Sequence, residues 1–218
     1  MSTEEKKPNF WKSLWEGAEV VWSYLDLRTF APTYTFNFYH APLGVDRDVF
    51  NRQHECERDI TLLTTGFVAN AECVRESSEA VRRVGGQHVH VGEDFQLGSH
   101  AKTMISISDA EMANLYSRSQ FVAGLRRDEG FELPAAEGLL CGARPIMFDA
   151  PHYRQWFDDF AEFVPEDRAS VVTNAIEAVL RRDDLEVSTA ESERAAQVFD
   201  WHTVIDGFWT SVRSRIYA

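Results

Sequence analysis

Cysteine is scarce in this chain of 218 residues, which contains Cys56, Cys73 and Cys141 and no C-x-x-C pair. So few cysteines argue against a disulfide framework or a structural zinc site, and they fit a reducing compartment. Long apolar runs are missing as well, since no stretch approaches the roughly 18 to 20 residues that a membrane helix needs. The charged start MSTEEKKPNF has no signal-peptide core. We therefore expect a cytoplasmic protein without a membrane span.

Positive charge is in deficit, with 22 Lys and Arg against 35 Asp and Glu and a formal net charge of −13. Such a field repels the phosphates of nucleic acids, so we do not expect nucleic acid as a partner. A local basic pocket for one small anion remains compatible with this charge. The pattern G-x-G-x-x-G is also absent, which argues against a nicotinamide-dependent dehydrogenase.

Aromatic residues gather in the first 40 residues. Their spacing over residues 10–25 predicts a helix with one apolar face. The alternation of Tyr34, Phe36 and Phe38 favours a strand. We treat residues 1–40 as a helical, aromatic segment. It either packs on the main domain or provides a docking surface for another lobe or subunit.

Residues 41–218 are predicted to form one α/β domain that ends in helices. From residue 59 onward, apolar β-branched runs alternate with amphipathic segments closed by glycine or opened by capping residues. This alternation predicts a Rossmann-like, doubly wound parallel sheet covered on both faces. Ligands of such sheets bind at the carboxyl ends of the strands. The loops of interest therefore lie at Gly66, Gly92, Ile105–Ile107 and Leu125–Leu133.

The most informative segment is DEGFELPAAEGLLCGARPIMFD, residues 128–149. A strand leads into a loop with Gly130, and a helix begins near Pro134. The backbone N–H groups of Phe131, Glu132 and Leu133 are then expected at a helix N-terminus, which binds anions. Glu137 lies about one turn into this helix, where a carboxylate can accept hydrogen bonds from the two hydroxyls of a ribose. The segment suits a sugar nucleotide.

These residues resemble a known family. Glu129 and Glu137 form the E-x7-E pattern of the large retaining GT-B glycosyltransferases, and EGFELP, CGARPIMF and Asp149 match the surrounding family text. HAPLGVDRDVF, SISDAEMANLYSRSQ and FDWHTVIDGFW extend the resemblance from His40 to the C-terminus. The variants GFELP and PHYRQWF are also similar to glycosyltransferases assigned to bacteriophages.

The resemblance implies transfer of a sugar from a nucleotide-sugar donor to an unknown acceptor, with retention of configuration. It implies no metal and no other cofactor, and uridine diphosphate is the default donor nucleotide. Glu129 is the implied catalytic residue beside the donor sugar, and Glu137 holds the ribose. The implied donor contacts come from Gly66 and Phe67 at the diphosphate, from Gly130, Phe131, Glu132 and Leu133 at the sugar and distal phosphate, and from Ile105 and Ser106 at the base.

Two departures from the family affect the charge of the site. The family usually has an Arg directly after the first-strand glycine and a Lys a few residues later, where this chain has Phe67 and Glu72. Glu132 stands in place of the usual glycine. The charge that develops on a departing diphosphate must be stabilised by some group. The candidate substitutes are Arg75, Arg126 and Arg127, of which Arg126 and Arg127 lie closer to the pocket.

A third departure is size, because about 40 residues cannot form the acceptor domain that such enzymes need, which takes on the order of 100 residues. We therefore expect a homo-oligomer or a separate acceptor-lobe protein as partner. The alternatives are a non-catalytic remnant that binds a nucleotide or nucleotide-sugar, and a sugar-nucleotide epimerase.

Overall fold

The computed structural model describes residues 13, 15–30, 37–52, 56–127 and 129–217. Its centre is a six-stranded sheet in which every neighbouring pair is parallel, in the order β5-β4-β3-β6-β7-β8. The strands are β3 (Ile60–Gly66), β4 (His88–Gly92), β5 (Ala101–Met104), β6 (Ser119–Gly124), β7 (Arg144–Phe148) and β8 (Glu162–Val164).

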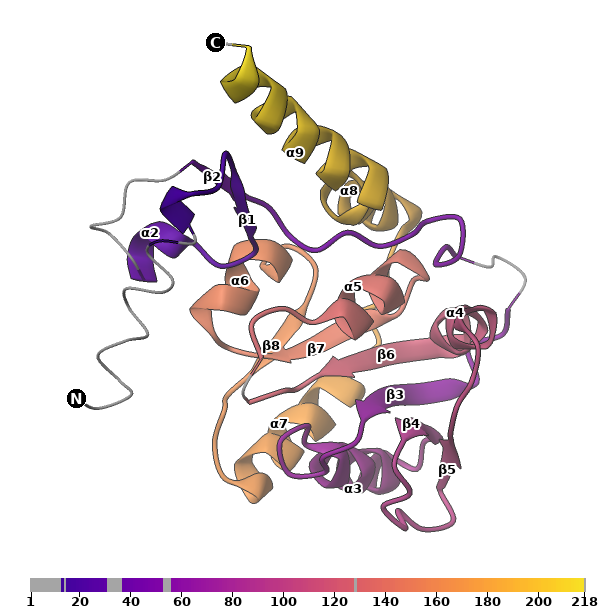
Figure 1. Ribbon diagram of the computed structural model, residues 1–218. Coiled ribbons are helices and arrows are strands. Elements are labelled where there is room, and N and C mark those ends of the chain that lie inside the picture. The colour runs from indigo at the N-terminus through magenta and orange to yellow at the C-terminus, as the bar shows by residue number, and fades with distance from the viewer. Residues whose placement is uncertain (1–12, 14, 31–36, 53–55, 128, 218) are drawn as a thin grey trace, which may run out of the picture.

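Helices cover both faces of the sheet, with α3 and α7 on one face and α4 and α5 on the other (Figure 1). Central strands buried on both faces need continuous apolar sequence, and the RPIMF run of β7 is buried at every position. The helices are α3 (Val74–Val84), α4 (Asp109–Arg118), α5 (Leu133–Leu140), α6 (Pro151–Phe157), α7 (Ala169–Leu180), α8 (Thr189–Phe199) and α9 (Trp201–Ile216). The predicted doubly wound, Rossmann-like fold is confirmed.

Local signals fix where the helices begin and end. Ser108 and Glu111 form a reciprocal capping box at the start of α4, and Ser188 and Glu191 form another at the start of α8. Gly85 ends α3 in the left-handed conformation that favours glycine. These residues explain why the helix boundaries lie close to those predicted from the sequence.

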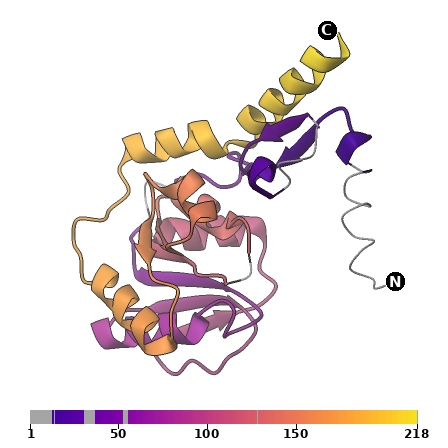
Figure 2. The same ribbon diagram turned by 90° about the vertical axis from the view of Figure 1, so that its left-hand side faces the viewer.

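A second, small sheet precedes the main one. Strand β1 (Val21–Ser23), the short helix α2 (Leu27–Phe30) and strand β2 (Phe38–His40) form a parallel β-α-β unit. This unit packs against α9, as both views show (Figures 1 and 2), with the ring of Trp22 at 5.7 Å from that of Phe208. The Tyr39 hydroxyl donates to the carbonyl of Val204 across 3.1 Å.

The helix predicted over residues 10–25 is therefore wrong at Val21–Ser23. The N–H of Val21 donates to the carbonyl of Asn37 across 2.7 Å, so strand pairing prevails over the helical spacing of the aromatic residues. Tyr34, Phe36 and the start of the predicted helix lie outside the described residues. Within the described ranges, no helix is long and apolar enough to cross a membrane.

Candidate functional site at the carboxyl edge of the sheet

The chain reverses its direction of travel across the sheet between β3 and β6. From β3 it proceeds outward through β4 to β5, then returns to β6 on the other side of β3 and proceeds to β7 and β8. Ligands of open α/β sheets bind outside the carboxyl ends of the two strands that flank such a switch point, a region called here the switch-point crevice. Gly66 ends β3 and Gly124 ends β6, so the loops that follow them form the candidate site.

A carboxylate lies directly on the end of β3. Gly66 has a φ of 146°, and a side chain added to it would collide with the carboxylate of Glu72. The N–H of Val68 donates to Oε2 of Glu72 across 2.7 Å, while the N–H of Glu72 donates to the carbonyl of Val68 across 3.1 Å. These two hydrogen bonds between Val68 and Glu72 hold the loop after β3 in a closed turn.

Arg126, at the end of β6, is surrounded by carboxylates. Its Nε lies 3.6 Å from Oε1 of Glu72 and 3.8 Å from Oε2 of Glu132, and its Nη1 lies 3.7 Å from Oε2 of Glu129. The guanidinium links the loop after β3 to the loop after β6. It is about one quarter exposed, so an anion in the crevice could reach it.

Glu132 is the most deeply buried of these carboxyl groups, with a side chain that is 1% exposed. Burial raises its pKa to about 8, although Arg126 acts in the opposite direction. The Tyr153 hydroxyl lies 3.0 Å from the carbonyl of Arg126 and 3.4 Å from Oε1 of Glu132. The hydroxyl thus donates to the carbonyl and, at longer range, to Glu132, a bond that lowers the pKa of Glu132 and so acts against the larger effect of burial. Glu132 thus adds little negative charge at neutral pH.

The loop between Glu129 and Leu133 packs against Tyr24, which directly follows β1 of the small N-terminal sheet. A side chain on Gly130 would approach Cε2 of Tyr24 to 2.5 Å, and the Phe131 ring lies 6.0 Å from that of Tyr24. Trp156 of α6 donates from Nε1 to the carbonyl of Tyr24 across 3.0 Å. Helix α5 begins at Leu133, as predicted, so its first N–H groups lie at the carboxyl edge of β6.

Glu137 is half-buried one turn into α5. The hydroxyl of Tyr116 in α4 donates to its Oε2 across 3.0 Å. Burial raises the pKa of Glu137, this hydrogen bond lowers it, and the charge of Asp109 raises it further. The carboxylate therefore lies between α5 and α4, held by Tyr116 in the last turn of α4.

The guanidinium of Arg127 contacts other groups than that of Arg126. Its Nη1 lies 3.2 Å from Oε1 of Glu166, its Nη2 donates to the carbonyl of Asp167 across 3.0 Å, and its guanidinium lies 5.2 Å from the centre of the Phe148 ring. These contacts direct Arg127 toward the β8 side. Arg126 is the better situated of the two arginines for an anion in the crevice.

Apolar side chains are exposed at the same edge. Phe67 follows β3 and is 72% exposed, and Ile105 follows β5 and is 63% exposed. Ser106, next to Ile105, has a left-handed φ of 55°. Exposed side chains of this size beside a crevice can cover a flat ligand group or a facing protein surface.

Metal ligands are not gathered at the site. Across the described ranges, no group of three or more His, Cys, Asp or Glu residues could hold a metal ion. Asp46 and Asp48, which have D-x-D spacing, belong to a turn in which Oδ1 of Asp46 accepts from the N–H of Asp48 across 2.9 Å.

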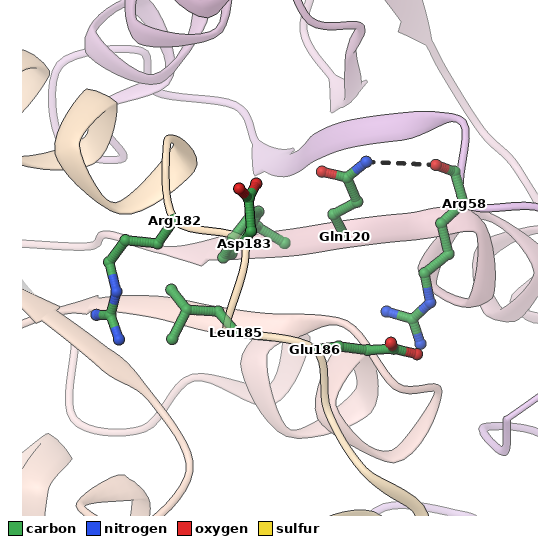
Figure 3. Close-up of a pocket in the computed structure, with 7 residues that line it drawn as sticks. Arg58, Gln120, Arg182, Asp183, Leu185 and Glu186 are labelled. Atoms are coloured by element: carbon green, nitrogen blue, oxygen red, sulfur yellow. Dashed lines mark hydrogen bonds between the residues drawn. The ribbon is translucent and has the colours of Figure 1, made fainter.

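A separate cavity of about 250 Å³ lies at the opposite edge of the sheet. Figure 3 shows Gln120, at the start of β6, beside Arg58, which precedes β3, with the Gln120 side-chain amide donating to the carbonyl of Arg58. The guanidinium of Arg58 donates hydrogen bonds to the carbonyls of Ser119 and Gly142. This cavity borders the amino ends of the strands, so it is distinct from the switch-point crevice.

The structure brings most of the predicted site residues to one edge. Glu72, Tyr116 and Tyr153 also contact the predicted residues but were not assigned a role from sequence. Glu72 was visible as a departure in charge, whereas the two tyrosines lie inside helices and carry no sequence signal. At the carboxyl edge lie Gly66, Phe67, Ile105, Ser106, Arg126, Glu129, Gly130, Phe131, Glu132, Leu133 and Glu137.

No protein-family model matches the chain. Among curated proteins, "Putative glycosyltransferase 41" of Sulfolobus islandicus filamentous virus is 36% identical over 59 residues, which cover 27% of this chain and 18% of the viral protein. That match supports relatedness over a short stretch.

Solved structures resemble nearly the whole chain. Sucrose-phosphate synthase from Thermosynechococcus elongatus superposes with a TM-score of 0.79 at 17% identity, over 98% of this chain and 62% of that protein. The pneumococcal O-GlcNAc transferase GtfA, solved with UDP and GlcNAc, gives 0.74 at 15% identity over 96% and 48%. WaaG, a glycosyltransferase of lipopolysaccharide biosynthesis, gives 0.68 at 14% identity over 97% and 67%. The chain thus shares the fold of GT-B glycosyltransferases and spans about half to two thirds of these proteins.

Proposed function

We propose that the chain is a glycosyltransferase subunit that transfers a sugar from a nucleotide-sugar donor to an acceptor, with retention of configuration. The observation that carries the proposal is the meeting of Arg126, the start of α5 and Glu137 at the switch point of the sheet. Cationic, amide and carboxylate groups are what the phosphates and ribose of such a donor require.

In this proposal, the donor diphosphate lies over Gly66 and the first N–H groups of α5, beside Arg126. Glu137 accepts hydrogen bonds from the ribose hydroxyls, and the base lies by Ile105 and Ser106. Uridine is the base we test first. Glu129, exposed at the mouth of the crevice, faces the donor sugar.

The reaction breaks the bond between the anomeric carbon and the diphosphate oxygen, and the electron pair leaves with the nucleoside diphosphate. Arg126 and the α5 amides stabilise that charge. The acceptor hydroxyl forms the new bond to the anomeric carbon and gives its proton to the departing phosphate oxygen. Glu129 orients the sugar and stabilises positive charge at the anomeric carbon. No metal is needed in this scheme.

The acceptor is bound in this proposal by a lobe that faces the crevice from outside the described domain. The chain spans 62% and 48% of two solved relatives, so those relatives have additional length that could hold such a lobe. The side chains of Trp209 and Ile216 on α9 are exposed and apolar, and they offer a contact surface. Mixed-subunit assemblies therefore belong in the assay.

The test measures release of nucleoside diphosphate from uridine, guanosine and adenosine diphosphate hexoses, with the protein alone and with candidate partner chains. Glu137→Ala is expected to weaken nucleotide binding, and Glu129→Gln to reduce turnover while binding persists. Glu193→Ala is the matched control, because Glu193 is exposed on α8. If Glu137→Ala binds the nucleotide as tightly as the unsubstituted chain, the assignment of the donor site is wrong.

A second candidate is a nucleotide-binding module without turnover. It is favoured by the engagement of Arg127 with Glu166 and by the carboxylate of Glu72 at the end of β3. Tight nucleotide binding without sugar release, in the presence of every partner tested, would select this candidate.

A further inference from the structure

The carboxylate of Glu72 binds the groups of the switch-point crevice that could bind a ligand anion. Its Oε2 accepts from the N–H of Val68 across 2.7 Å, and its Oε1 lies 3.6 Å from Nε of Arg126. The carboxylate rests on the Cα of Gly66. A backbone amide after a glycine and a guanidinium are groups that would otherwise hold a phosphate.

The burial of Glu72 and the other carboxyl groups near Arg126 decide which anion binds Arg126. The side chain of Glu72 is 13% exposed, so its charge acts at short range with little screening by solvent. Burial favours the protonated form of Glu132, the buried neighbour of Arg126. Glu72 and Glu129 are then the carboxylates that compete for Arg126, and Glu129 is much more exposed.

We propose that Glu72 sets the affinity of the crevice for its phosphate-bearing ligand, as an internal anion that must leave Val68 and Arg126 before a diphosphate can bind. This inference rests on the proposed function, since it concerns the diphosphate of the same ligand. Glu72 is a positioning and selectivity residue and not a catalytic one.

The loop that carries Glu72 is built to allow such an exchange. Residues 69–73 form turns between β3 and α3, and Cys73, which caps α3, has a left-handed φ of 48° without a side-chain cap. The Glu72 side chain can withdraw while the backbone hydrogen bond from its N–H to the carbonyl of Val68 is kept. Arg126 then changes partner from a carboxylate to a phosphate.

The experiment compares binding of UDP and of uridine by calorimetry in the full chain and in Glu72→Gln, which keeps the shape and removes the charge. We expect UDP to bind roughly tenfold more tightly to Glu72→Gln, while uridine binding is unchanged. Glu93→Gln is the matched control, because Glu93 is an exposed carboxylate that follows β4 at the same edge. A general effect of net charge would appear equally in both variants.

A second comparison tests the role of Arg126. In an Arg126→Gln background, Glu72→Gln should gain much less UDP affinity, because the partner for which both anions compete is gone. If Glu72→Gln does not fold, as judged by thermal melting, Glu72→Asp takes its place. Its shortened side chain withdraws the carboxylate from Val68, and tighter UDP binding is expected there too.

The outcomes separate this inference from the proposed function. UDP binding that is tighter in Glu72→Gln supports the inference, also where the unsubstituted chain binds no UDP. Equal or weaker UDP binding in Glu72→Gln, with clear binding by the unsubstituted chain, overturns the inference and leaves the proposed function standing. Absence of nucleotide binding in all variants overturns both. An equal gain in Glu93→Gln also overturns the inference.

Discussion

Tyr116 and Glu137 join two helices across the candidate site. The fully buried hydroxyl of Tyr116 in α4 donates to Oε2 of Glu137 in α5 across 3.0 Å. The bond fixes one oxygen of a carboxylate that is otherwise free to rotate. The second oxygen is left as an acceptor in a partly desolvated position, where a hydrogen bond to a ligand hydroxyl is stronger than in water.

Removal of this hydroxyl should weaken recognition of the ribose. Tyr116→Phe is expected to lower the affinity for UDP and for uridine by a similar factor, roughly threefold to tenfold, because one hydrogen bond contributes about 1 kcal/mol. Calorimetry with both ligands measures it, and inorganic pyrophosphate, which has no ribose, is the control ligand. A loss confined to pyrophosphate would contradict this role.

Glu132 should make the stability of the fold depend on pH. Its pKa in the folded chain is raised to about 8 by burial, from 4.5 in the unfolded chain. Between these values the folded state holds a proton that the unfolded state has lost, so stability is fully present below pH 4.5 and falls as the pH rises toward 8. Glu132→Gln keeps the shape and does not titrate.

We therefore expect Glu132→Gln to gain stability relative to the unsubstituted chain between pH 5 and pH 8, by about 4 kcal/mol at the upper end. Urea unfolding at several pH values measures the difference. Glu129→Gln is the control, because it also removes one carboxylate beside Arg126 but at a side chain that is 41% exposed. A flat difference for Glu132→Gln would show that its carboxyl is ionised in the fold.

Gly130 should be required by its contact with the N-terminal sheet. An added methyl group would lie 2.5 Å from Cε2 of Tyr24, so Gly130→Ala should destabilise the chain by about 1 to 3 kcal/mol. The cost should shrink in a Tyr24→Ala background, where the ring is absent. Thermal melting of the two single variants and the double variant measures the coupling, and additive effects would contradict the contact.

The fold was predictable because its signals are local. The apolar RPIMF run, the glycine that ends α3 and the capping serines of α4 and α8 each act within a few residues. Val21–Ser23 was not predictable, because its strand forms by pairing with β2 after an intervening segment, while its own aromatic spacing favours a helix.

The site was predictable where the sequence order follows the chemistry. Gly130, the start of α5 and Glu137 lie within one segment, so their arrangement follows from one loop and one helix. The pairing of Arg126 with Glu72 joins residues far apart in the chain and depends on the neighbouring positions of β3 and β6. The sequence identified Glu72 as a departure in charge and Arg126 as a candidate substitute for the missing basic residues, but it could not show that the two meet.

The two consecutive arginines after β6 should differ in function because their side chains have different partners. Arg126 lies among carboxylates at the crevice, whereas Arg127 is held by Glu166, by the carbonyl of Asp167 and by the face of Phe148. Arg126→Gln is expected to weaken UDP binding by tenfold or more, since a charge-assisted contact contributes roughly 1.5 to 3 kcal/mol, and to flatten its dependence on salt. Arg127→Gln keeps UDP affinity within about twofold and lowers the melting temperature instead, because surface and partly buried contacts of this kind stabilise the fold. Calorimetry at low and high salt, with melting curves for both variants, distinguishes the two roles. The reverse result, with UDP affinity lost in Arg127→Gln alone, would transfer the phosphate contact to the β8 side of the crevice.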